Sequence, residues 1–166
     1  MMTVRPATPE DNEAIREVIA SAVATLRETY RPGAGTVARK AAILGQLHRL
    51  VGVINGRVVG TTQYWIDGDA VRIVGLGVHS QFRKMGVATE LVRRVAEIGD
   101  TLGAKRLVLH TVKQTGNVPV FEKLGFEVVS ETEDQHSESS TYATLVDVEM
   151  HKPLKAFSAP ATEHSE

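Results

Sequence analysis

The chain has 166 residues, no cysteine and a formal net charge of −1 at pH 7. The absence of cysteine excludes disulfides, cysteine-ligated zinc and a thiol nucleophile, and the near-zero charge argues against broad binding to nucleic acid or a membrane. No apolar run reaches the roughly eighteen residues that span a bilayer, and the first residues lack the apolar core of a signal peptide. We therefore expect one cytoplasmic domain.

The chain opens with a pattern that predicts a strand and a capped helix. Residues 3–7 have the character of a short strand, and residues 8–28 carry an apolar stripe at helical spacing. Thr8 can cap this helix, Pro9 suits its first turn, and Asp11 lies where a capping-box acid lies. The start of the helix is therefore marked by local chemistry.

A second helix is predicted over residues 37–47, after a break at residues 30–35 that contains proline and glycine. Two helices between the first and second strands leave room for a lid over a substrate. A plain structural hairpin explains the same pattern equally well.

The period then changes from helical to two, which predicts an antiparallel meander of three strands over residues 50–54, 57–66 and 70–78. Asn55 and Gly56 form a strong two-residue hairpin signal, and residues 67–69 make the next tight turn. Gly75 and Gly77 lie inside the third strand, where glycine marks a bulge or the close approach of another backbone or a ligand.

The passage from the third strand of the meander into the next helix predicts an anion site. Gly86 and Ala88 are small residues at the start of the helix, where backbone N–H groups lack partners and carry partial positive charge. Arg83 and Lys84 add two cations beside them. We predict a phosphate or pyrophosphate cradle at residues 83–89, although the Walker and dinucleotide motifs are absent; the alternative is a turn whose glycine serves only packing.

The rest of the chain predicts a strand, a short helix, a strand, an exposed turn and a last strand, over residues 106–112, 118–124, 127–130, 131–140 and 142–150. The strand–helix–strand crossover predicts that the first of these strands lies parallel to the third strand of the meander. Residues 155–166 are predicted to be a disordered tail.

This order of elements and several short motifs resemble the GNAT superfamily of N-acetyltransferases, which transfer an acetyl group from acetyl-CoA to an amine. Arg83-x-x-Gly86-x-Ala88 is similar to the acetyl-CoA signature of that family. The segments that carry the resemblance are VRPATPED, LGVHSQFRKMGVATELV, VFEKLGFEVV and VEMHKPL.

The resemblance implies an α/β (mixed α+β) fold in a single domain over residues 1–154. Its central sheet would be mixed but mostly antiparallel, with about seven strands, one parallel pair that splays apart, and four flanking helices. Acetyl-CoA would lie in the wedge between the splayed strands, beyond their carboxyl ends.

The resemblance also implies which residues hold the cofactor. Backbone N–H groups from Lys84 to Thr89 would bind the pyrophosphate, and the strand end around Gly77 would pair with the pantetheine arm. Gln114 has the spacing of an asparagine that contacts pantetheine in the family, whereas Asn117 has its chemistry. The full implied set is Leu76, Gly77, Val78, Arg83, Lys84, Met85, Gly86, Val87, Ala88, Thr89, Gln114, Asn117 and Phe121.

Acetyl transfer needs a base for the amine, a donor to the thioester carbonyl, and a proton for the leaving thiolate. The family commonly supplies that proton from a tyrosine, but Phe121 occupies its position here. His110 is the preferred candidate for the base, with Tyr64 as a possible acid or substrate contact and His79 as a weaker alternative; a water relay would need none of them. We predict no metal site, since no two histidines have the i, i+4 spacing of a zinc helix.

We therefore predict an N-acetyltransferase that acts on a primary amine, preferably of a small molecule such as an amino acid derivative, a polyamine or an antibiotic-like amine. One alternative is a CoA-binding or acyl-CoA-binding sensor without catalysis, and another is a peptide or protein N-acetyltransferase. The family resemblance further suggests a homodimer that contacts through the final strands.

Overall fold

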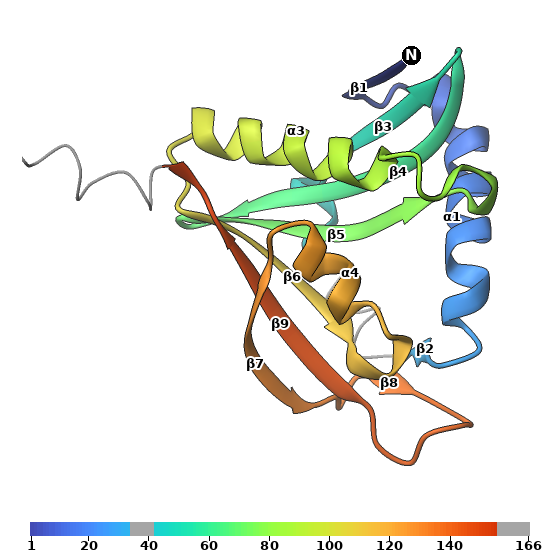
Figure 1. Ribbon diagram of the computed structural model, residues 1–166, viewed down its shortest axis with the longest axis vertical. Helices are drawn as coiled ribbons and strands as arrows, with labels where there is room; N and C mark the ends of the chain where they lie inside the picture. Colours follow the sequence, from blue (N-terminus) through green and yellow to red (C-terminus); the bar gives the residue numbers. More distant parts are fainter. Residues whose placement is uncertain (34–41, 156–166) are drawn as a thin grey trace, which may run out of the picture.

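The computed structural model describes residues 1–33 and 42–155, which form a seven-stranded mixed sheet with helices on both faces (Figure 1). The order across the sheet is β1-β3-β4-β5-β6-β9-β7, and every neighbouring pair is antiparallel except β5 with β6. The strands are β1 (Met2–Pro6), β3 (His48–Ile54), β4 (Arg57–Asp67), β5 (Ala70–Val78), β6 (Arg106–Val112), β7 (Glu127–Glu133) and β9 (Val146–Pro153). The predicted mixed sheet and its single parallel pair are confirmed.

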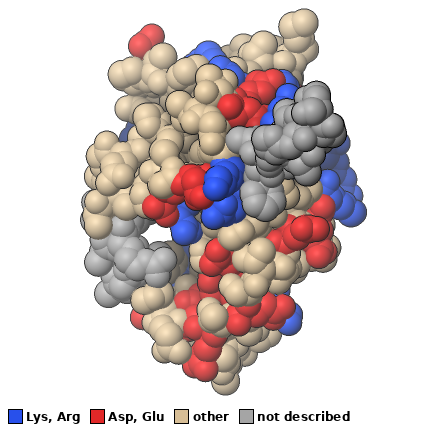
Figure 2. All heavy atoms as spheres, turned by 90° about the vertical axis from the view of Figure 1, so that its left-hand side faces the viewer, with Lys and Arg blue, Asp and Glu red and all other residues tan. Residues whose placement is uncertain are grey.

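The last strand of the sheet, β7, is an acidic edge. All of its residues are exposed, and Figure 2 shows acidic side chains gathered over the lower part of the face on the left-hand side of Figure 1. Acidic residues of β7 and the chain just after it are Glu127, Glu131, Glu133, Asp134 and Glu138. Glu131 has an ion pair with Lys113 at 2.9 Å, so this edge of the sheet keeps a net negative charge.

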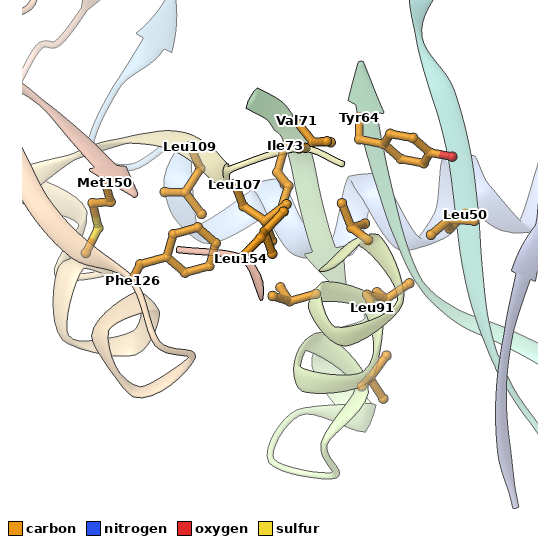
Figure 3. Close-up of a cluster of buried hydrophobic side chains, with 14 of the residues drawn as sticks. Leu50, Tyr64, Val71, Ile73, Leu91, Leu107, Leu109, Phe126, Met150 and Leu154 are labelled. Carbon is orange, nitrogen blue, oxygen red and sulfur yellow. The ribbon is translucent and has the colours of Figure 1, made fainter. Parts of the chain in front are cut away.

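Two hydrophobic cores lie on opposite faces of the sheet, because successive side chains of a strand alternate between its faces. In β3, Leu50 belongs to the larger core and its neighbour Val51 to the smaller one. The larger core packs under α3 (Val87–Thr101) and α4 (Val118–Lys123), and the smaller one packs against α1 (Asn12–Leu26). Figure 3 labels ten side chains of the larger core: Leu50, Tyr64, Val71, Ile73, Leu91, Leu107, Leu109, Phe126, Met150 and Leu154.

Helix α1 follows a 3₁₀ turn whose capping chemistry agrees with the prediction. The buried Asp11 carboxylate accepts the Thr8 N–H at 2.8 Å and two Arg5 guanidinium N–H groups at 2.8 and 3.0 Å. These donors hold the pKa of Asp11 well below its usual range, chiefly through the hydrogen bond from Arg5. The same bonds tie the start of the helix to β1.

The glycine signals of the meander also agree with the structure. Asn55 and Gly56 both have positive φ, 49° and 79°, as the tight hairpin turn requires. In β5 the pairing with β4 shifts near Gly75, whose φ is +68°, so the predicted bulge is present. A Cβ atom on Gly77 would lie 2.9 Å from the Cβ of Ala22, which shows that this glycine lets α1 approach the sheet.

The helix count differs from the prediction. Three α-helices, α1, α3 and α4, lie within the described residues, where four were predicted. The predicted second helix over residues 37–47 falls largely outside the described residues, and the part that is described ends in a 3₁₀ turn at Leu44–Gln46. None of the helices in the described ranges is long and apolar enough to cross a membrane.

Residues 131–140 are mostly exposed, as predicted. The prediction of a single turn is wrong, because β7 continues to Glu133 and β8 (Ser137–Glu138) pairs with β2 (Arg31–Pro32). The last strand is also displaced from the predicted residues 142–150 to Val146–Pro153. The Ser139 hydroxyl accepts the N–H groups of Thr141 and Tyr142 at 3.1 and 3.0 Å. Those groups therefore belong to a turn and not to a strand.

Candidate functional site

The parallel strands β5 and β6 pair only over a short distance and then separate. The ladder runs from Ala70 with Arg106 to Arg72 with Val108, although β5 continues to Val78 and β6 to Val112. β6 stays paired with β9 along its whole length, so it is the edge of β5 that loses its partner. The structure therefore contains a split between these two strands on the side of their carboxyl ends.

The turn from β5 into α3 has the properties of an anion cradle. Lys84 and Gly86 have positive φ values of 64° and 82°, a backbone form that turns neighbouring N–H groups toward one concave side. Within residues 1–33 and 42–155, no backbone N–H from Lys84 to Thr89 donates to another residue, and the first helical bond runs from the Glu90 N–H to the Gly86 carbonyl at 3.0 Å. A Cβ atom on Gly86 would meet nothing within 4 Å, so the approach to these donors is open.

The start of α3 is held at this position by close packing on the sheet. A Cβ atom on Gly60 would lie 2.6 Å from the Val87 Cγ1 atom, and one on Gly52 would lie 3.2 Å from the same atom. Glycine at these two positions lets the first turn of α3 rest directly on β3 and β4. Val87 and Leu91 are buried there, and burial of each such side chain stabilises the fold by roughly 1.5–3 kcal/mol. The positive end of the helix is thereby fixed beside the split.

His110 lies at the base of the split. It lies two positions after Val108, the last residue of β6 that pairs with β5. Its neighbour Leu109 belongs to the larger core. Because successive side chains of a strand alternate between its faces, the imidazole points to the face that carries α1. Its Nδ1 atom is 2.8 Å from Asp147 Oδ2, and its Nε2 atom is 3.5 Å from Arg72 Nη1 and 3.9 Å from Glu149 Oε1. Arg72 is in turn paired with Asp67 at 2.6 Å.

Tyr64 is not brought together with His110. Its side chain is part of the larger core under α3, where it is 8% exposed and stacks on His48 with ring centres 5.1 Å apart. Burial raises its pKa above the usual value for tyrosine. The two predicted catalytic residues therefore point to opposite faces of the sheet. His79 caps the turn after β5, where its Nδ1 accepts the Gln81 N–H at 3.2 Å.

The candidate cofactor-binding residues after β6 differ in whether their side chains already have partners within the protein. The Gln114 amide is bound within the protein, since its oxygen accepts the Val146 N–H at 3.0 Å and its nitrogen donates to the Thr144 carbonyl at 3.4 Å. The Asn117 side chain makes no hydrogen bond to any other residue in the described part of the chain. Phe121 packs edge-to-face on Phe126, with ring centres 6.3 Å apart, so it serves the core and offers no proton.

A small open pocket of about 300 Å³ lies where the end of α1 meets β8. The hydroxyls of Ser139 and Thr141 donate to the carbonyls of Thr29 and Glu28, just after α1, at 2.6 and 3.4 Å. These bonds join two segments that are far apart in the sequence. The pocket is lined by Arg27, Glu28, Thr29, Tyr30, Arg31, Glu138, Ser139 and Ser140. Sequence reasoning did not find this pocket or the carboxylates of Asp147 and Glu149, because no local pattern marks contacts between such distant segments.

Comparison with known proteins identifies the class of this protein. Residues 15–126 match a sequence model described as the acetyltransferase (GNAT) family. The match covers more than half of the chain, so the chain belongs to this family, as its motifs suggested.

Similar proteins agree with this assignment. N-acetylaspartate synthetase of Danio rerio is 39% identical over 88 residues, which are 51% of this chain and 31% of that protein. The ribosomal-protein-S18-alanine N-acetyltransferase from Escherichia coli has a TM-score of 0.73 at 14% identity, over 93% of this chain and 94% of that one. A Salmonella typhimurium protein solved with its cofactor acetyl-CoA has a TM-score of 0.70 at 22% identity, over 96% and 98%. The structural likenesses show the fold, and the chain spans about a third of the length of the fish relative.

Proposed function

We propose that this protein transfers the acetyl group of acetyl-CoA to a primary amine. The observation that supports the proposal is the turn at residues 83–89, whose backbone N–H groups are unused and open and which lies directly beside the split between β5 and β6. A diphosphate held in the cradle would leave a long thioester-bearing arm free to enter the split. The fit is supported by the unused N–H groups, by the exposed Arg83 and Lys84, and by the free space at Gly86.

The free edge of β5 would hold the arm that enters the split. The His79 N–H donates to the Val59 carbonyl in β4 at 2.8 Å, and successive N–H groups of an extended strand point to opposite edges. The Val78 N–H therefore points toward the split, where it can donate to a thioester carbonyl. Asn117 is the better candidate for a side-chain contact to the arm, because the Gln114 amide is already bound within the protein.

Acetyl-CoA supplies an acyl group activated as a thioester. In the proposed reaction the amine nitrogen bonds to the acyl carbon, the carbon–sulfur bond breaks, and the amine proton moves to His110 Nε2. Phe121 has no proton to give, so we propose that the departing sulfur takes a proton from solvent or from protonated His110. A neutral imidazole suits the role of base because its unperturbed pKa is near 6.5.

We propose that the acceptor is a small amine. The pocket beside α1 is about 300 Å³, which is at the small end of the range for ligand sites. Its lining carries both arginine and glutamate side chains, which suits a molecule that bears an ammonium and a carboxylate. The acidic edge along β7 would attract cationic amines. The name of the Danio rerio relative points in the same direction, since its product is an acetylated amino acid.

The experiment that tests the proposal follows release of the CoA thiol in the presence of single amines. The panel contains aspartate and other amino acids, polyamines, antibiotic-like amines, and a peptide with N-terminal alanine. We expect release above the hydrolysis rate with at least one small amine. If only the peptide is acetylated, the chain is a peptide or protein N-acetyltransferase and the small-molecule assignment is wrong.

The second candidate function is a CoA-binding sensor without catalysis, which the packing of Phe121 against Phe126 favours. Tight CoA binding without turnover on the whole panel would support it. Replacement of His110 by alanine adds a second test, because loss of a general base lowers the rate about 10²- to 10⁴-fold without changing CoA affinity. An unaltered rate and pH profile in this variant would reject His110 as the base.

A further inference from the structure

We infer that Asp147 is a positioning residue that fixes the tautomer of His110 and stabilises its protonated form during acetyl transfer. This inference rests on the proposed function, but its central claim concerns a contact that can be measured without turnover. His110 and Asp147 lie 37 residues apart in the sequence and meet because β6 and β9 are neighbours.

The pair is held by backbone pairing and not by flexible loops. β6 and β9 are antiparallel, with His110 opposite Glu149 and Val112 opposite Asp147. Residues two positions apart on a strand point to the same face, so Asp147 and His110 are diagonal neighbours on the α1 side of the sheet. Their side chains are 40% and 30% exposed, so the strand pairing, and not burial, brings the two groups together.

The chemistry of the contact determines the position of the proton. An ionised carboxylate can only accept a hydrogen bond, so Asp147 Oδ2, at 2.8 Å, requires the proton on His110 Nδ1. The Nε2 atom of the neutral ring then carries a lone pair. Arg72 lies on that side with its Nη1 at 3.5 Å, and since guanidinium can only donate, it favours the same tautomer. The lone pair of Nε2 therefore faces Arg72, and an incoming amine must displace this 3.5 Å contact before it gives its proton to the ring.

The groups around the ring also balance its charge. After Nε2 takes a proton from the amine, the imidazolium lies between two carboxylates: Asp147 is bonded to Nδ1, and Glu149 Oε1 lies 3.9 Å from Nε2. The cation of Arg72 opposes protonation, although Asp67 neutralises it in part. The titratable and charged groups that surround His110 in β4, β5 and β9 are Asp67, Arg72, Asp147, Glu149 and His151, the last bonded to Glu149 at 2.6 Å.

The first test reads the tautomer directly. Long-range ¹⁵N–¹H NMR of the histidine rings, recorded at a pH where the His110 ring is neutral, should show the proton on Nδ1 in the full-length protein. In Asp147→Asn the carboxylate that requires this proton is replaced by an amide that can also donate, so the share of rings with the proton on Nδ1 should fall. A wild-type His110 with its proton on Nε2, or an unchanged tautomer in the variant, would overturn the inference whether or not any amine is acetylated.

The second test uses the acceptor found by thiol release. Asp147→Asn should lower kcat/KM at least about tenfold, because the base loses its fixed tautomer and its counter-charge. Asp147→Glu, which keeps the charge and the acceptor, should restore part of the lost kcat/KM. CoA affinity and melting temperature should not change.

Glu133→Gln is the matched control, because it removes the same charge from an exposed residue of β7, opposite Val146 and next to the Asp147 pair in the ladder. It should leave the His110 tautomer as in the wild type. If Glu133→Gln changes the tautomer as far as Asp147→Asn does, the effect is a general one of surface charge and Asp147 has no positioning role.

Discussion

Replacement of Gly86 by glutamate is the most direct test of the anion cradle. The position has a φ of +82° and free space within 4 Å of a new Cβ atom, so a side chain can begin there without a clash, and its carboxylate would lie close to the unused N–H groups. Two unit charges about 4 Å apart repel by about 4 kcal/mol at an effective dielectric constant near 20. This energy corresponds to a roughly thousandfold weaker Kd for CoA.

Gly103→Glu provides a matched control at the opposite end of α3. Gly103 has a φ of +76° and equally free space, and it lies beyond a helix of fifteen residues, which extends for about 22 Å. Both variants incur a similar backbone strain of about 1–2 kcal/mol. The helix dipole favours an acid at the start of α3 and disfavours one at its end, so Gly86→Glu should be at least as stable as Gly103→Glu.

The assay combines thermal denaturation with titration calorimetry of CoA. We expect similar melting temperatures for the two variants in the absence of CoA, a lost or thousandfold weakened affinity in Gly86→Glu, and wild-type affinity in Gly103→Glu. A folded Gly86→Glu protein that binds CoA within about twofold of the wild type would refute the placement of the pyrophosphate at residues 83–89. Equal loss in both variants would refute it too, since the effect would not depend on the cradle.

Two further predictions concern the fold that supports the site. Gly60→Ala should lower the free energy of unfolding by about 1–3 kcal/mol, because its Cβ atom would lie 2.6 Å from Val87 Cγ1. Denaturant unfolding of the double variant Gly60→Ala/Val87→Ala should show a smaller loss of stability than the sum of the two single variants. Simple additivity of the two losses would contradict this contact. Asp11→Asn should cost about 1–2 kcal/mol at pH 7, because it weakens the bonds from Arg5 and Thr8. The folded pKa of Asp11 is depressed, so its contribution is present above the unfolded pKa near 3.9 and is lost as the pH falls below it; a difference between wild type and Asp11→Asn that stays constant down to pH 2 would contradict this assignment.

Several features could be predicted from the sequence because their cause lies within a few residues. The capping acid at Asp11, the hairpin at Asn55 and Gly56, and the bulge at Gly75 each depend on local hydrogen bonds or on a backbone angle that few residues adopt. The turn that contains Gly86 belongs to the same group, since small residues, two cations and a helix start are adjacent in the chain. Local chemistry was therefore sufficient for the meander and for the position of the candidate cradle.

The surroundings of the candidate catalytic groups could not be predicted in this way. Whether Tyr64 points into the core or toward the split depends on strand register, and a shift of one residue would reverse it. The approach of Asp147 to His110 and the occupation of the Gln114 amide by β9 both depend on a strand whose start was predicted four residues too early.

The sequence by itself determined the class of fold, the turn that we propose binds a diphosphate, and the absence of the usual tyrosine at Phe121. Only the tertiary structure decided which polar groups surround His110 and that a pocket joins the end of α1 to β8. The physical reason is that pairing between distant strands brings together residues whose individual patterns carry no information about each other, whereas turns, caps and helix starts are specified by neighbours in the chain.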